Sequence, residues 1–104
     1  MINRIRQDIR FMQCEEKIAG GKLVCIEVWS SDSSTADRVR ISGDFFLHPE
    51  DSIEDIEDSL IGAPLDSDEC GIESRIARTL QKRGASLVGV SAKDIARMFV
   101  RAVR

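Results

Sequence analysis

The stretch "KLVCIEVWS", Lys22 to Ser30, decides the fold class, because it is the clearest strand in the chain. Apolar and mixed side chains alternate along it, which is typical of a strand with one buried face. The two sets are Val24, Ile26 and Val28 on one side, and Leu23, Cys25, Glu27 and Trp29 on the other. We therefore expect a β-sheet that buries one of its faces.

Two neighbouring segments extend this strand into a sheet. Residues 9–18, "IRFMQCEEKI", form a weaker strand that ends at residues 19–21, where two glycines supply turn geometry. After the polar loop 31–37, residues 38–43, "RVRISG", alternate again between apolar and polar side chains. The expected result is a three-stranded antiparallel sheet in the order 1-2-3.

The period of the pattern changes after Pro49, where an amphipathic helix is expected. Its apolar residues recur at i, i+3, i+7 and i+8, at Ile53, Ile56, Leu60 and Ile61. Pro49 suits the first helical position, and residues 62–64 end the helix.

Two more helices are expected in the second half of the chain. One lies between the capping segment 65–71 and Gly84. The other begins at Ser91, which stands three residues before Asp94, the spacing of a capping box. With about three helices backing one sheet, the predicted class is an α+β two-layer sandwich.

Length and charge limit the classes of function. The 104 residues fit a single domain, 1–104, and the net charge of −3 offers no basic field for nucleic acid or anionic lipid. No apolar run approaches the roughly 20 residues of a membrane span. Three widely spaced cysteines and the lack of a secretory pattern indicate a cytoplasmic protein with reduced thiols. Residues 1–10 fit either a helix or an extension of the first strand.

No catalytic, cofactor or metal site is predicted on this chain. His48 is the only histidine and precedes Pro49 at the expected strand-to-helix corner, so we interpret it as a corner residue. No glycine spacing matches a nucleotide-binding loop. The block 50–58 holds six carboxylates, interpreted as a solvated helix face, with a docking surface for a basic partner as the alternative.

Phe45 and Phe46 raise a question about partners. Neighbours in an extended segment point to opposite faces, so both rings cannot enter one side of a core. Either each ring packs under a different element, or one of them is exposed to a partner subunit. Both interpretations stay open at this point.

Several stretches together resemble one protein family. They are "GGKLVCIEVWSSDSSTADRVRISGDFFLHPEDSIEDIEDSLIGAPLD", in which residues 21–24, 41–46, Pro49 and 60–62 are the most telling, and "SAKDIARMFVRAVR" at residues 91–104. From about Phe11 to Arg104 the chain is similar to the small C-terminal accessory domain of lipoate–protein ligases. In archaeal-type bipartite enzymes this domain is a separate subunit.

The resemblance implies a fold like that of sulfur-acceptor and iron–sulfur scaffold proteins, and a division of labour between subunits. A larger catalytic subunit would bind ATP, Mg²⁺ and lipoate, supply the catalytic lysine, and form lipoyl-adenylate. It would then transfer the lipoyl group to a lysine of an acceptor domain. This chain would dock on that subunit as a non-catalytic helper of the adenylation step.

The contact with the catalytic subunit is expected at the strand-to-helix corner, because glycine permits close backbone approach and an exposed aromatic ring can anchor an interface. The residues expected to line it are Ser42, Gly43, Asp44, Phe45, Phe46, His48 and Pro49.

The alternative function is a cysteine-based sulfur acceptor or scaffold, since the implied fold is shared with such proteins. That function needs a reactive cysteine on an exposed loop. Cys14 and Cys25 are predicted in strands, and Cys70 follows two acidic residues that oppose thiolate formation. The accessory subunit is the favoured hypothesis.

Overall fold

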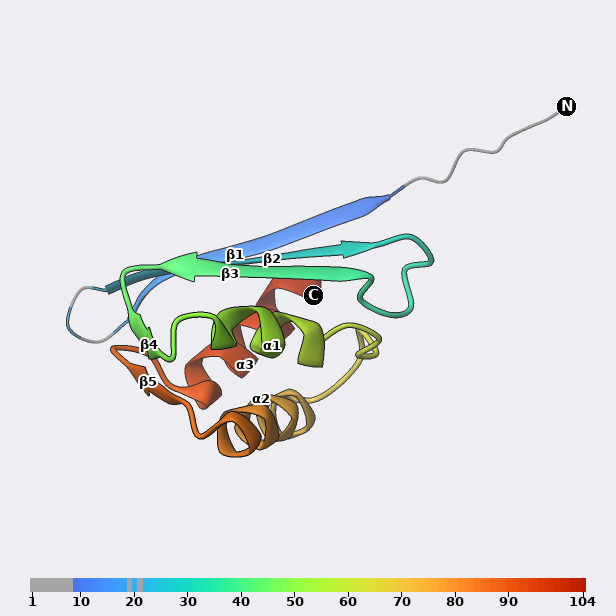
Figure 1. Cartoon of the computed structure of the whole chain (residues 1–104). Coiled ribbons are helices and arrows are strands. Elements are labelled where there is room, and N and C mark those ends of the chain that lie inside the picture. Colours follow the sequence, from blue (N-terminus) through green and yellow to red (C-terminus); the bar gives the residue numbers. More distant parts are fainter. Residues whose placement is uncertain (1–8, 19, 21) are drawn as a thin grey trace, which may run out of the picture.

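The computed structural model describes residues 9–18, 20 and 22–104, and the predicted α+β architecture with a sheet in the order β1-β2-β3 is confirmed (Figure 1). The antiparallel sheet consists of β1 (Arg10–Ile18), β2 (Lys22–Ser30) and β3 (Arg38–Gly43). The helices are α1 (Ser52–Ser59), α2 (Glu69–Arg83) and α3 (Ala92–Val103). The predictions for residues 1–8, 19 and 21 lie outside the described residues.

The core lies between the sheet and the helices. α3 packs under β1 and β2, α1 packs against β3, and α2 lies against both helices (Figure 1). Of the two faces of β2, the one with Val24, Ile26 and Val28 is buried. Each of the three helices also buries apolar side chains in this core. The largest fully buried side chains include Phe99, Ile26, Ile56, Ile72 and Met98. Burying each of them stabilises the fold by about 1.5–3 kcal/mol relative to exposure.

The expected caps of α2 and α3 are present. The Asp68 carboxylate accepts the Gly71 N–H at 2.8 Å, and Gly84 ends α2 in the left-handed region with φ of 60°. Ser91 and Asp94 form the capping box of α3, in which each side chain accepts the backbone N–H of the other residue.

The prediction for the start of α1 is wrong. The helix begins at Ser52, with Asp51 as its N-cap residue, and Pro49 lies in the preceding turn. The Pro49 carbonyl accepts the Ser52 N–H at 3.0 Å, so the proline forms this turn instead of the first helical position.

A second, two-stranded sheet was not predicted. It pairs β4 (Phe46–His48) with β5 (Ser86–Val88) in antiparallel fashion. Strands of three residues are too short to show a period, and the sequence suggested only a strand-to-helix corner at the first of them. This ribbon joins the middle of the chain to the segment before α3. No helix in the described part of the chain has the length and apolar character to span a bilayer.

Candidate docking site

The strand-to-helix corner begins at Gly43, the last residue of β3, where the chain leaves the sheet. Gly43 has φ of +148°, and a Cβ added there would lie 2.3 Å from the Leu23 carbonyl oxygen. The next residue, Asp44, donates its N–H to the same carbonyl at 2.8 Å. Gly43 therefore permits a close approach to the backbone of β2, which turns the chain toward the two phenylalanines.

The two phenylalanines lie in different surroundings. Leu47 is buried, Phe45 is half-buried against the core, and the Phe46 residue is 71% exposed. The strand alternation thus directs Phe46 away from the core. Of the two interpretations left open by the sequence, the structure shows the one in which a single ring is exposed.

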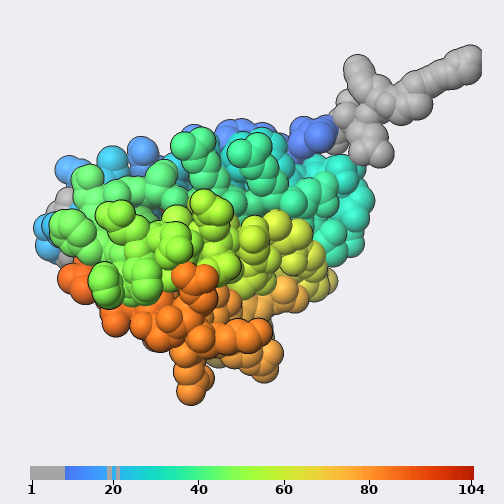
Figure 2. Space-filling model, in the orientation of Figure 1, coloured from blue at the N-terminus to red at the C-terminus, as the bar shows by residue number. Residues whose placement is uncertain are grey.

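Phe46 has an apolar neighbour that sequence reasoning missed. It pairs across the two-stranded sheet with Val88, which is 60% exposed. We call Phe46 and Val88 the apolar corner. Figure 2 shows the green segment that includes β4 bordering the orange segment that includes β5 at one end of the molecule. The signal for Val88 was the apolar run at residues 87–90, which lacks a helical period.

Two hollows flank the phenylalanines. One of about 530 Å³ is lined by Gly20, Lys22, Gly43, Asp44, Phe45 and Phe46. The other, of about 170 Å³, lies toward α1 and is lined by Phe45, Phe46, Leu47, Glu50 and Ile53. The exposed Phe46 ring thus lies between two hollows, and side chains of a partner can fit into them.

The other predicted contact residues differ in their exposure. Ser42, Asp44 and His48 are exposed, and Pro49 is half-buried. His48 belongs to the two-stranded sheet, whereas Cys14 and Cys25 belong to the three-stranded sheet. Of the predicted residues, Gly43, Asp44, Phe45 and Phe46 lie together along one hollow.

The acidic block beside the corner is partly structural. Asp51 and Asp55 bind Arg83 of α2 at 3.0 and 2.7 Å. Glu57 accepts the Ile41 N–H at 2.8 Å, and burial raises the pKa of its carboxyl. Four residues of the block are exposed, namely Glu50, Asp51, Glu54 and Asp58, and the other two, Asp55 and Glu57, are half-buried. The prediction that this face is solvated holds for only part of the block.

The cysteines differ in exposure and reactivity. Burial, followed by the neighbouring Glu16, raises the pKa of the Cys14 thiol. Burial and the nearby Glu27 likewise raise the pKa of Cys25. A raised pKa keeps both thiols protonated and poorly nucleophilic at neutral pH. Cys70 is exposed near the start of α2.

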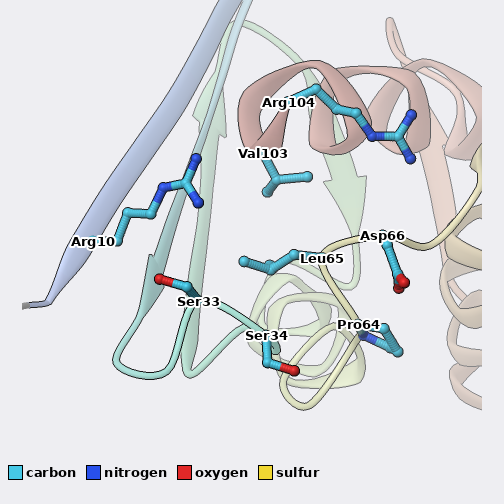
Figure 3. A pocket seen from close by; sticks show the side chains of 8 residues that line it. All are labelled: Arg10, Ser33, Ser34, Pro64, Leu65, Asp66, Val103 and Arg104. Carbon is cyan, nitrogen blue, oxygen red and sulfur yellow. The ribbon is translucent and has the colours of Figure 1, made fainter.

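A further hollow of about 410 Å³ lies away from the corner, and sequence reasoning did not predict it (Figure 3). It is lined by Arg10, Ser33, Ser34, Pro64, Leu65, Asp66, Val103 and Arg104. Its lining comes from four separate segments of the chain, so no short sequence motif could predict this hollow. In Figure 3 the Arg104 side chain turns away from Arg10, and it donates to the Ser67 carbonyl at 3.1 Å. The two arginines therefore do not converge on one ligand position.

Comparison with known proteins gives one match. The chain matches no protein-family model and no curated protein. It is similar to one chain of a solved archaeal lipoylation system from Thermoplasma acidophilum, which comprises a bipartite lipoate protein ligase and its E2 lipoyl domain. The identity is 27% and the TM-score 0.62, over 95% of this chain and 98% of that one. This chain is thus similar, over nearly its whole length, to a component of that lipoylation system.

Proposed function

We propose that this chain is the non-catalytic accessory subunit of a bipartite lipoate–protein ligase. It docks on a larger catalytic subunit in the cytoplasm and enables the ATP-dependent conversion of lipoate to lipoyl-adenylate. ATP, Mg²⁺ and lipoate bind to the catalytic subunit, and the lipoyl domain that accepts the group is an indirect partner. The observation that carries this proposal is the match, over 95% of the chain, to a component of an archaeal bipartite ligase system.

The apolar corner supports docking through the predicted residues. Interfaces concentrate their binding energy in an apolar or aromatic anchor surrounded by polar groups. Phe46 and Val88 are such an anchor, and exposed Ser42, Asp44 and His48 lie within four residues of Phe46 in the chain. Covering the Phe46 ring would contribute roughly 1.5–3 kcal/mol to binding from apolar burial alone.

The first experiment measures lipoyl-adenylate formation by the purified catalytic subunit with and without this chain. We expect formation to depend on the chain. Equal rates in its presence and absence would overturn the proposal. Mass spectrometry of the chain after the reaction with ligase and lipoate distinguishes another role, since a lipoyl group on one of its own lysines would make it the acceptor.

The second experiment locates the contact. Phe46→Ser is expected to weaken binding to the catalytic subunit about 30-fold, as loss of a central anchor of roughly 2 kcal/mol does. The matched control is Ile61→Ser, because Ile61 is also an exposed apolar residue, at 46%, but follows α1 outside the corner. Equal effects of the two variants in calorimetry would remove the corner from the interface.

The alternative, a sulfur acceptor, has weaker physical support. The raised pKa of Cys14 and of Cys25 disfavours thiolate formation at both sites. Cys70 is exposed and is the remaining candidate. Incubation with a cysteine desulfurase followed by mass spectrometry tests it. Persulfide sulfur on Cys70 would favour the acceptor function, and an unmodified Cys70 would exclude it.

A further inference from the structure

The two edges of the three-stranded sheet differ in whether another element covers their backbone groups. At the β3 edge, α1 packs against the strand, and Glu57 takes the Ile41 N–H at 2.8 Å. That backbone donor is therefore unavailable to another strand. The opposite edge is β1, which among the described residues pairs only with β2 (Figure 1).

The register shows which backbone groups of β1 face outward. The carbonyls of Leu23 and Trp29 in β2 accept N–H groups from the β3 side, so the odd-numbered residues of β2 point their backbone groups toward β3. Alternate residues of a strand point to alternate edges. Val24, Ile26 and Val28 therefore point toward β1.

Their partners in β1 are the even-numbered residues, since Cys14 pairs with Ile26 and Met12 with Val28. These residues turn their N–H and C=O groups back toward β2. The odd-numbered residues consequently direct theirs to the open edge. They are Phe11, Gln13, Glu15 and Lys17.

The side chains of these four residues are all exposed, on the sheet face opposite the helices. The Phe11 ring packs on Trp29 with centroids 5.1 Å apart, and the Arg38 guanidinium lies 5.0 Å from the centre of the Trp29 ring. The open edge thus carries an aromatic group at one end, followed by a neutral, an acidic and a basic side chain.

β1 is also held firmly in place. Glu16, on its helix-facing side, binds Arg97 at 3.0 Å and Arg101 at 2.6 Å, both on α3. A strand with a fixed backbone loses little further conformational entropy when another strand pairs with it.

We propose that the open edge of β1 is a strand-addition site, distinct from the apolar corner, that binds an extended segment of another protein. The segment runs antiparallel to β1. It places an acidic residue opposite Lys17, a basic residue opposite Glu15 and an apolar residue opposite Phe11, where that residue extends the stack on Trp29. Main-chain hydrogen bonds supply affinity, and the three side-chain pairs set the register.

A second copy of this chain fits the edge less well. Antiparallel pairing of two β1 strands over their full length, centred on Cys14, sets Phe11 against Lys17 and Gln13 against Glu15. No aromatic or ionic pair forms in that register. Shifting the register to bring the two Phe11 rings together leaves Glu15 and Lys17 beyond the overlap. Shifting it the other way sets Glu15 against Lys17 in both directions, but then only residues 14–18 of each copy overlap and Phe11 has no partner, so no register of two copies satisfies all three side chains. The occupant is therefore a strand of a different sequence.

The probe is the synthetic peptide Thr-Asp-Thr-Lys-Thr-Gln-Thr-Val-Thr, and its control has the Asp and Lys exchanged. Binding is followed by amide NMR shifts and hydrogen exchange on the whole chain. In the free chain, the amides of Gln13 and Glu15 should exchange much faster than that of Cys14, which is bonded to β2. The peptide should protect the odd-numbered amides of β1 and leave the even-numbered ones unchanged.

The matched peptide is expected to bind about tenfold more tightly than its control, since two opposite-charge pairs replace two like-charge pairs. In the double variant Glu15→Lys with Lys17→Glu, which keeps the net charge, this preference should reverse. Gln13→Pro should abolish binding and leave the fold intact, because it removes only an outward N–H. Thermal unfolding checks that point.

Four results overturn the proposal. They are equal affinity for the two peptides, an unchanged preference in the double variant, no shift of any β1 amide at millimolar peptide, and slow exchange at Gln13 and Glu15 in the free, dilute chain. The last result combined with a dimeric mass in sedimentation would assign the edge to a second copy of the chain. None of these results depends on the ligase assay, so the two proposals fail separately.

Discussion

Replacing Gly43 with alanine should destabilise the protein strongly. Gly43 closes β3 with φ of +148°, where residues with a Cβ are disfavoured. An added Cβ would also lie 2.3 Å from the Leu23 carbonyl oxygen and 2.8 Å from the Val24 Cα. Both atoms belong to the backbone of β2, the central strand, so neither can rotate away.

The magnitude follows from two costs. Backbone strain at a disfavoured conformation is worth about 1–3 kcal/mol. Overpacking against atoms that cannot move adds about 1–3 kcal/mol. The sum, about 2–6 kcal/mol, is a large part of the roughly 5–15 kcal/mol that stabilises a typical domain. At this size it corresponds to a fall in Tm of more than about 10 °C.

The assay is urea and thermal unfolding followed by circular dichroism, with Gly62→Ala as the control. Gly62 also has a positive φ, of +85°, but a Cβ there would meet nothing within 4 Å. Gly62→Ala therefore carries the strain without the clash and should cost only about 1–2 kcal/mol.

The difference between the two variants isolates the close approach of the corner to β2. If Gly43→Ala unfolds at the same urea concentration as Gly62→Ala, the contact with Leu23 and Val24 does not hold the corner, and the argument for its shape fails. A larger effect at Gly43 would mean that the corner cannot move away from the sheet without loss of stability.

Three further predictions concern charges and caps. Burial acts to raise the pKa of the Glu16 carboxyl, but hydrogen bonds from Arg97 and Arg101 outweigh burial, and the pKa is lowered. The stabilisation that results is present above the unfolded-state pKa. It is lost as pH falls through the folded-state pKa. Glu16→Gln should thus cost about 1–2 kcal/mol near neutral pH and little near pH 3, in urea titrations. Burial raises the pKa of Glu57, so its stabilisation is fully present below the unfolded-state pKa and is lost as pH rises through the folded-state value. Glu57→Gln should therefore gain stability relative to wild type as the pH rises through that range, in urea titrations. Ser91→Ala should lower the stability by about 1 kcal/mol in thermal unfolding, because it removes the cap of α3.

The parts of the fold that could be predicted are those with local signals. β2 and β3 have the bounds that their alternation indicated, and α3 begins at the expected capping box. Alternation and capping depend on residues a few positions apart, so a sequence shows them directly. The two-stranded sheet gives no such signal, because its strands are short and far apart in the chain.

The site was predictable to the same degree. The sequence predicted the corner and showed that both phenylalanines could not enter one side of the core, but it left open whether a ring would be exposed. Val88 was not predicted, since it reaches Phe46 only through tertiary pairing. Gly43 was expected to let a partner approach closely. In the structure the close approach is to β2 of the same chain, a contact that depends on sheet twist and register.

The ion pairs that join β1 to α3 have a consequence for biosynthesis. Glu16 meets Arg97 and Arg101 across 81 and 85 positions of the chain. The ribosome makes the first strand of the sheet long before the helix that covers it. Until residues 92–103 leave the exit tunnel, the apolar side of β1 and β2 lacks the helix that packs under it, and the chain is a substrate for chaperones that bind exposed apolar strands. Folding of this protein is therefore completed only after its last helix has been synthesised.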